Sequence, residues 1–148
     1  METIGDAYMC VATNQEGGRT LDASKYAERV CSVALLVQQR CSGLKFRGRE
    51  LRLRMGVHSG SCVSGIVGSV MPRYCFFGNT INIANRLENS GEVGRIHLST
   101  DTAELLRELG NPAFVLTERE GRVQLKGVKE PVTTFWLSRS AAPEVWAH

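Results

Sequence analysis

Apolar residues recur at two different spacings along the chain, and these spacings predict both helices and strands. Over residues 22–42 the apolar positions fall three or four apart, which is typical of a helix with one buried face, and Gly43 ends the pattern. The face expected to be buried comprises Tyr26, Val30, Val33, Ala34, Val37 and Cys41.

Strict alternation of apolar and polar residues predicts a half-buried strand in the segment LRLRMGVH, residues 51–58. Its apolar face consists of Leu51, Leu53, Met55 and Val57, and its polar face carries Arg52, Arg54 and His58. Shorter apolar runs between glycines predict further strands. These are a hairpin in ETIGDAYMCV (2–11), a strand pair in SGSCVSGIVGS (59–69), the strands RYCFF (73–77) and RIHLS (95–99), and three strands around Phe114, Val123 and Phe135.

Two more helices are expected, in NTINIANRLENSG (79–91) and in STDTAELLREL (99–109). In the first of these, Ile81, Ala84 and Leu87 form the core face, while Asn82 and Arg86 lie one turn apart on another face. Because helices and strands are mixed with hairpins, the class is α+β. The chain is expected to form one domain over residues 1–138, followed by a mobile tail over residues 139–148.

Composition excludes several classes of protein. The net charge of +3 is too small to predict binding to nucleic acid or direct contact with a membrane, although fourteen of the 18 basic residues are arginines, which suit an anionic partner. The five cysteines form no C-x-x-C pair, which favours free thiols in a reducing compartment. No signal peptide and no apolar run long enough to span a membrane is present. A cytoplasmic location is expected, either for the chain itself or for a cytoplasmic domain of a larger soluble or membrane-bound protein.

Several catalytic templates do not fit. The glycines of GSCVSGIVG have the spacing of a phosphate-binding loop, but Ile66 and Val67 stand where Lys and Ser or Thr are required. The segment GVHSG lacks the G-x-S-x-G pattern of a nucleophile elbow, and the three histidines have no transition-metal spacing. The polar residues that are left, Asp6, Arg54, Asn82, Arg86 and Lys126, would together suit a polyanion held with a hard cation.

A resemblance sharpens this hypothesis. The segments ETIGDAYM, LRMGVHSG, GIVGSVMPRYCFFGNTINIANRLEN and GRIHLS resemble the catalytic domain of class III nucleotide cyclases, most closely that of eukaryotic guanylate cyclases. The similarity runs from residue 1 to about residue 137. It implies a ferredoxin-like βαββαβ core with additional strands and a dimer with active sites between the subunits. A homodimer is expected, with a heterodimer as the alternative.

The resemblance also implies roles for single residues. Asp6 matches an aspartate that binds Mg²⁺ or Mn²⁺, and Arg54 matches an arginine that contacts the triphosphate of GTP. Asn82 matches the asparagine that positions the ribose, and Arg86 resembles the arginine that offsets charge on the α-phosphate in the transition state. Lys126 matches the lysine that reaches the β- and γ-phosphates. The implied reaction is conversion of GTP to 3′,5′-cyclic GMP and pyrophosphate.

Glu2 and Cys75 resemble the pair that selects the base. A carboxylate can accept hydrogen bonds from N1–H and the N2 amine of guanine, and a thiol can donate to O6. Adenylate cyclases of the family usually carry Lys and Asp or Thr at these two positions, so an adenylate cyclase is the less favoured alternative.

The chain departs from the family pattern in three ways. Asn79 stands where many relatives have Asp, and Val128 stands where many have Lys. The family's first metal-binding aspartate lies on a strand that precedes the hairpin, and nothing before Glu2 can supply it. The chain is therefore expected to be truncated, with its first elements missing, and to be poorly active by itself. A non-catalytic dimerisation or regulatory module is the second hypothesis.

Overall fold

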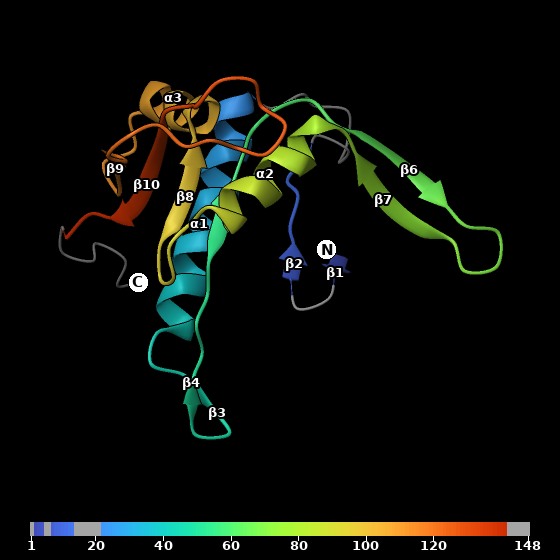
Figure 1. The fold of residues 1–148 in the computed structure, drawn as a ribbon, viewed down its shortest axis with the longest axis horizontal. Helices are drawn as coiled ribbons and strands as arrows, with labels where there is room; N and C mark the ends of the chain where they lie inside the picture. Colours follow the sequence, from blue (N-terminus) through green and yellow to red (C-terminus); the bar gives the residue numbers. More distant parts are fainter. Residues whose placement is uncertain (1, 5–6, 14–21, 142–148) are drawn as a thin grey trace, which may run out of the picture.

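The computed structural model describes residues 2–4, 7–13 and 22–141, and its centre is a four-stranded sheet. The strands lie in the order β5 (Met55–Val57), β8 (Ile96–Ser99), β10 (Thr134–Arg139) and β9 (Phe114–Glu118) (Figure 1). β5 is parallel to β8, and the other neighbours are antiparallel. The α+β class expected from the sequence is confirmed.

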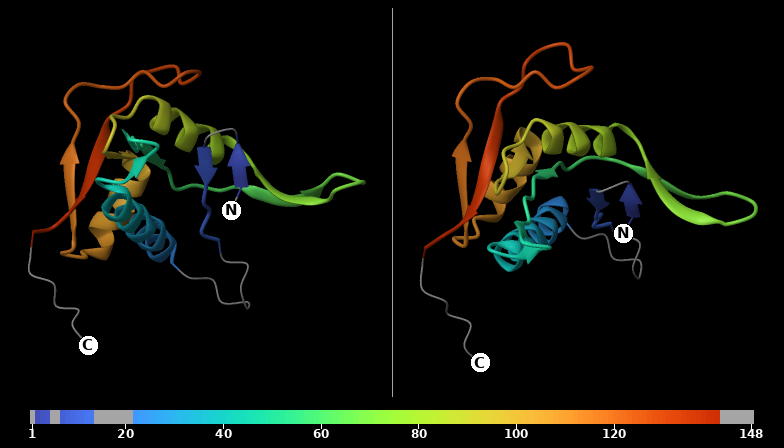
Figure 2. Two further views of the ribbon diagram at one scale, coloured as in Figure 1. Left: turned by 90° about the horizontal axis from the view of Figure 1, so that it is seen from below. Right: turned by 60° about the horizontal axis from the view of Figure 1, so that its bottom comes forward.

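Side-chain alternation along the sheet explains how the helices are distributed on its two faces. In β8, Ile96 and Leu98 belong to the hydrophobic core, whereas His97, between them, bonds to the backbone of α2. Helices α1 (Ala23–Cys41) and α3 (Thr100–Leu109) therefore cover one face, and α2 (Asn79–Asn89) covers the other (Figure 2).

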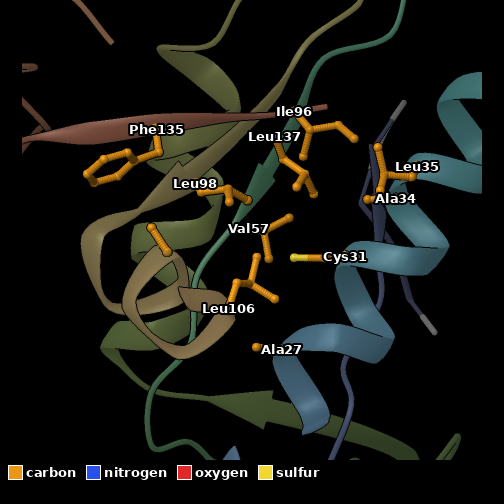
Figure 3. Close-up of a cluster of buried hydrophobic side chains, with 11 residues drawn as sticks. Ala27, Cys31, Ala34, Leu35, Val57, Ile96, Leu98, Leu106, Phe135 and Leu137 are labelled. Carbon is orange, nitrogen blue, oxygen red and sulfur yellow. The ribbon is translucent and has the colours of Figure 1, made fainter. Parts of the chain in front are cut away.

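The core lies between the sheet and the pair α1 and α3 (Figure 3). Cys31 is fully buried in it, and burial raises the pKa of its thiol to about 12, so this side chain packs as a small neutral hydrophobe. The buried members are Ala27, Cys31, Ala34, Leu35, Val57, Ile96, Leu98, Ala103, Leu106, Phe135 and Leu137.

The predicted core face of α1 is partly wrong. Val33 and Val37 are 48% and 40% exposed, while Ala27 and Leu35, which were not assigned to the core, are buried. The helix begins after the N-cap Asp22, whose side chain accepts a hydrogen bond from the Ser24 amide. α1 has two neighbouring apolar stripes, and the one with more small residues packs against α3, because small side chains allow the two helices to approach closely.

Some strand predictions also need correction. Residues 51–54 are not part of β5, and Leu51 is exposed because this segment follows a small hairpin, β3 (Lys45–Phe46) with β4 (Arg49–Glu50), that the sequence pattern did not reveal. Val123 forms only an isolated bridge with Val132. The segment 59–69 contains one strand, β6 (Val63–Val67), and not two. At the other end of the domain β10 extends to Arg139, and residues 142–148 of the expected tail lie outside the described residues.

Two further hairpins, besides that of β3 and β4, lie outside the central sheet. β1 (Glu2–Ile4) pairs with β2 (Ala7–Met9), as the sequence predicted. β6 pairs with β7 (Arg73–Phe77) and projects from the body as a long arm (Figures 1 and 2). No helix in residues 22–141 has the length and hydropathy needed to cross a membrane.

Candidate functional site

Helix α2 carries two of the predicted site residues, and its position is set by contact with β5. Gly56 lies directly against the helix backbone, so that a Cβ at this position would come within 2.3 Å of the Glu88 nitrogen and 2.4 Å of the Ala84 oxygen. At the start of the helix, the Thr80 hydroxyl donates to the Ser61 carbonyl at 2.5 Å. Only glycine allows the helix to lie this close to the strand.

Arg86 and Lys126 are brought together from distant parts of the chain. The Val128 amide donates to the Leu125 carbonyl at 3.0 Å, closing a turn in which Gly127 has φ +76°. A Cβ on Gly127 would lie 3.3 Å from Nη2 of Arg86, so the Arg86 guanidinium lies against this turn. Lys126 precedes Gly127 and is exposed. The result is a surface with two cations and no carboxylate bonded to either among the described residues.

Arg54 lies on the opposite flank of α2. Its Nε is 2.9 Å from Oε1 of Glu88, and both side chains are partly exposed. Glu88 follows Arg86 by two residues, which is about 200° around a helix, whereas Asn82 precedes Arg86 by four residues, which is about 40°. Asn82 and Arg86 therefore share one flank with Lys126, and Arg54 lies by the other. The predicted site residues form two separate groups in one chain.

The remaining predicted residues are placed only in part. Cys75 is half-buried on β7, opposite Gly65 of β6. Glu2 lies in β1, opposite Met9. Asp6 lies outside the described residues. Among the residues that are described, no three His, Cys, Asp or Glu side chains gather in a way that could hold a metal ion.

His58 has a structural role. Its Nδ1 lies 2.8 Å from the Ser99 hydroxyl, and burial lowers its pKa, against the opposing effect of the Asp101 carboxylate. His58 borders an open depression of about 490 Å³ between the starts of α2 and α3. None of the predicted site residues is among the side chains that line this depression.

Sequence reasoning missed Glu88, Gly56 and Gly127. Glu88 is 34 positions from Arg54, and Gly127 is 41 positions from Arg86. No local pattern connects such pairs, because they meet only when α2 is docked. The one available signal was the glycine directly after Lys126, which is typical of a turn.

Comparison with known proteins shows the family to which the chain belongs. A family model described as "Adenylate and Guanylate cyclase catalytic domain" matches residues 1–139. Guanylate cyclase 32E of Drosophila melanogaster is 42% identical over 148 residues, covering 98% of this chain and 12% of that protein. Atrial natriuretic peptide receptor 2 of Anguilla japonica is 44% identical over 138 residues, covering 93% and 13%. The chain thus spans about an eighth of the length of these relatives.

Solved structures show the same fold. The guanylate cyclase domain of RhGC from Catenaria anguillulae, in complex with GTP, has a TM-score of 0.70 and 26% identity, covering 82% of this chain and 63% of that one. The catalytic core of a rhodopsin-guanylyl cyclase with converted specificity, in complex with ATPαS, has a TM-score of 0.70 and 25% identity, covering 83% and 63%. The chain belongs to the adenylate and guanylate cyclase catalytic domain family.

Proposed function

We propose that the chain provides the substrate-binding surfaces of a guanylate cyclase, which converts GTP to 3′,5′-cyclic GMP and pyrophosphate. The observation that carries this proposal is the meeting of Arg86 with the Lys126–Gly127 turn beside Asn82. Lys126 would bind the β- and γ-phosphates, and Asn82 would orient the ribose. Arg86 would stabilise the charge that develops on the α-phosphate while the ribose 3′-hydroxyl attacks it.

The two flanks of α2 would serve different active sites of a homodimer. Arg54, on the far flank, cannot reach the surface formed by Arg86 and Lys126 without passing the helix. A two-fold axis would bring the Arg54 flank of one chain to the Arg86 flank of its partner and so complete two equivalent sites. A heterodimer with one such site is the alternative.

The arm formed by β6 and β7 supports dimerisation. Its apolar side chains are unusually exposed, with Ile66 at 74% and Val70 at 92%. A projecting hairpin with apolar residues in water is typical of a surface that another protein covers. The exposed apolar residues of the arm are Val63, Ile66, Val67, Val70, Met71, Tyr74 and Phe77.

Mg²⁺ or Mn²⁺ belongs to the proposal through Asp6, whose carboxylate is a suitable hard ligand. When bound, the ion lowers the pKa of the ribose hydroxyl and neutralises phosphate charge. Arg54 would approach the same triphosphate, and its ion pair with Glu88 would orient its guanidinium.

We further propose a cytoplasmic location. All five cysteines are free thiols in the structure, which suits a reducing compartment.

The base would be read by Glu2 and Cys75, and this choice is tested by exchange of the pair. In the longest natural protein that contains this chain, the wild type should form cyclic GMP in preference to cyclic AMP from equal GTP and ATP. Glu2→Lys with Cys75→Asp should reverse the donor and acceptor pattern. Each unpaired buried group costs about 1–3 kcal/mol, so the ratio of kcat/KM for the two nucleotides should change by at least about 100-fold.

The same assay separates the alternatives, and Cys41→Asp, in α1, is the control that should leave base preference unchanged. A wild type that prefers ATP would identify an adenylate cyclase. A folded protein that forms neither cyclic nucleotide, with Mg²⁺ or Mn²⁺, would show a non-catalytic module. A double variant with full GTP preference would refute the role of Glu2 and Cys75.

A further inference from the structure

His97 is a fully buried titratable residue that the proposed reaction does not use. It lies in β8 on the face of the sheet covered by α2, and its imidazole packs on the Trp136 ring with 4.7 Å between ring centroids. Histidine is an unusual choice at such a position, where an apolar residue would pack without needing two hydrogen-bond partners. Its contacts show what the ring holds in place.

Both ring nitrogens are bonded, and the partners define the protonation state. Nδ1 lies 2.8 Å from the Leu87 carbonyl oxygen, which can only accept, so Nδ1 carries the proton. Nε2 lies 2.8 Å from the Thr134 hydroxyl and 3.4 Å from Nη1 of Arg119. Both of these groups can donate to Nε2. The surroundings therefore suit the neutral imidazole with its proton on Nδ1.

These contacts close the C-terminal end of α2. Leu87 is in the last turn, where helix carbonyls lack partners within the helix. Arg119 donates from Nη1 to the carbonyl of the C-cap residue Ser90 at 2.7 Å. His97 and Arg119 thus bind neighbouring carbonyls at the end of the helix, and the positive charge of Arg119 suits the negative end of the helix dipole.

Arg86 is directly affected by this end of the helix. It precedes Leu87, and its own carbonyl accepts a hydrogen bond from the Ser90 amide at 3.0 Å. Its guanidinium lies against Gly127 of the Leu125–Val128 turn. A shift or fraying of the last turn of α2 would therefore move the Arg86 side chain away from Lys126.

We propose that His97 is a positioning residue, which in its neutral form clamps the end of α2 and so holds Arg86 in place, and that protonation of His97 releases this clamp. The inference rests on the proposed function, because it assigns the purpose of the clamp to the reaction at Arg86. A proton on Nε2 would turn this nitrogen into a donor, so that the Thr134 hydroxyl would have to accept instead of donate. It would also place a second positive charge 3.4 Å from Nη1 of Arg119. Repulsion between these charges would weaken the bond of Arg119 to the Ser90 carbonyl, and this is the contact that protonation releases.

The electrostatic surroundings of His97 favour its neutral form. Burial lowers the pKa of His97 below its usual 6.5, and Arg119 and Arg95 lower it further, whereas the hydrogen bond to Leu87 and the Glu92 carboxylate raise it. The unfolded chain therefore binds the proton more readily than the folded one. The stability contributed by neutral His97 is complete above pH 6.5 and decreases as the pH falls below that value.

The first test compares kcat and KM between pH 5.5 and pH 8 in the cyclase-active protein. His97→Ala should lower kcat at pH 7.5 by about 10- to 100-fold, the size expected from a small misplacement, with KM changed less than about threefold. His97→Asn with Thr134→Val keeps a donor near Leu87, removes the hydroxyl that would lose its acceptor, and cannot titrate. In the wild type, kcat should fall as the pH decreases below 6.5, partly because His97 becomes protonated. The double variant should retain most of the kcat at pH 7.5 and should lose the part of this fall that His97 causes.

His58→Asn is the matched control, because His58 is the other histidine among the described residues and its pKa is also lowered by burial. Its side chain bonds to Ser99 and lies near Asp101, away from the end of α2. It should keep the acid decline. If the His97→Asn, Thr134→Val protein has the same pH profile as the wild type, or if folded His97→Ala has normal kcat, the positioning role is refuted.

A second measurement does not depend on activity. Nitrogen NMR of His97 should show the proton on Nδ1 at pH 7.5. Hydrogen exchange of the amides of residues 87–91, corrected for intrinsic rates, should increase below pH 6.5 in the wild type and in His58→Asn, but not in the His97→Asn, Thr134→Val protein. A protein with this exchange pattern but without GTP turnover would refute the proposed function and the role for Arg86. A protein with turnover but with pH-independent exchange would refute the clamp and leave the proposed function intact.

Discussion

At the scale of single residues, the site depends on where a side chain is absent. Gly127 allows the Arg86 guanidinium to lie on the backbone of a turn, and it has a φ of +76° that other residues adopt only with strain. The missing side chain and the positive φ are thus both needed at Gly127. The positive φ forms the turn that presents Lys126, and the missing side chain leaves room for Arg86.

Gly127→Ala should separate these two effects from simple strain. The left-handed conformation should cost about 1–2 kcal/mol in the free energy of unfolding. The added methyl group should also displace the Arg86 guanidinium, so kcat for GTP should fall more than in a control variant that has the same strain but no neighbouring guanidinium. Gly121→Ala is the control, because Gly121 has φ +73° with open space around it. Thermal unfolding and cyclic GMP formation are measured for both. Equal turnover in the two variants would contradict a supporting role for Gly127.

The sequence allowed some of these residue-level features to be predicted. The spacing of Asn82 and Arg86 places them on one face of any helix, and the structure has that helix. The contacts of Arg86 with Gly127 and of Arg54 with Glu88 could not be predicted, because these residues meet only through tertiary packing. The side chain of Glu2 and the position of Asp6 stay predictions.

At the scale of elements, α2 is held at three places along its length. Thr80 binds its start to the loop before β6, Gly56 lies against its middle, and His97 binds its end. The three contacts come from different parts of the chain. An element fixed in this way can present Asn82 and Arg86 in a defined orientation, although Asn82 is exposed and Arg86 is only half-buried.

Gly56→Ala should therefore damage the protein more than a typical surface change. The added Cβ would overlap the backbone of α2, which cannot move without breaking the contacts at its two ends, so we expect a loss of about 3 kcal/mol or more in the free energy of unfolding. Gly65→Ala, in β6 with no atoms near the new methyl group, should change stability by less than about 1 kcal/mol. Denaturant unfolding measures both. A difference below 1 kcal/mol would show that α2 can shift freely.

The elements themselves were largely predictable, whereas their packing faces were less so. Helical spacing located all three helices that the described residues contain, and RIHLS was correctly predicted as a strand. The face of α1 was partly wrong because two apolar stripes adjoin on that helix, and periodicity alone does not decide which one is buried. The short hairpin of β3 and β4 escaped detection because each strand has only two residues.

At the scale of the whole molecule, the arm of β6 and β7 combines two tasks. It exposes a row of apolar residues, and it carries Cys75, which we assign to the base. If a second chain covers the arm, the base pocket and the dimer interface form together. Substrate recognition is then a property of the pair.

Ile66→Glu should break this association without disturbing the fold. Ile66 is largely exposed, so its replacement should alter stability by no more than about 0.5 kcal/mol, whereas a charge in a buried interface should shift the dimer toward monomer and lower turnover in parallel. Val115→Glu, on the exposed edge strand β9, is the control. Analytical ultracentrifugation measures the association. A variant that stays dimeric and active would show that the arm is not the interface.

The division of α2 into two flanks has a consequence for heredity. In a homodimer built as proposed, each site takes Arg54 from one chain and Arg86 from the other. When a chain mutated at Arg54 pairs with a chain mutated at Arg86, both mutations fall in the same site, and the second site has both residues intact. Two alleles that are each inactive alone would then complement one another. A single damaged allele beside a normal one would leave one working site in every mixed pair, and its effect on output would be partial and not dominant.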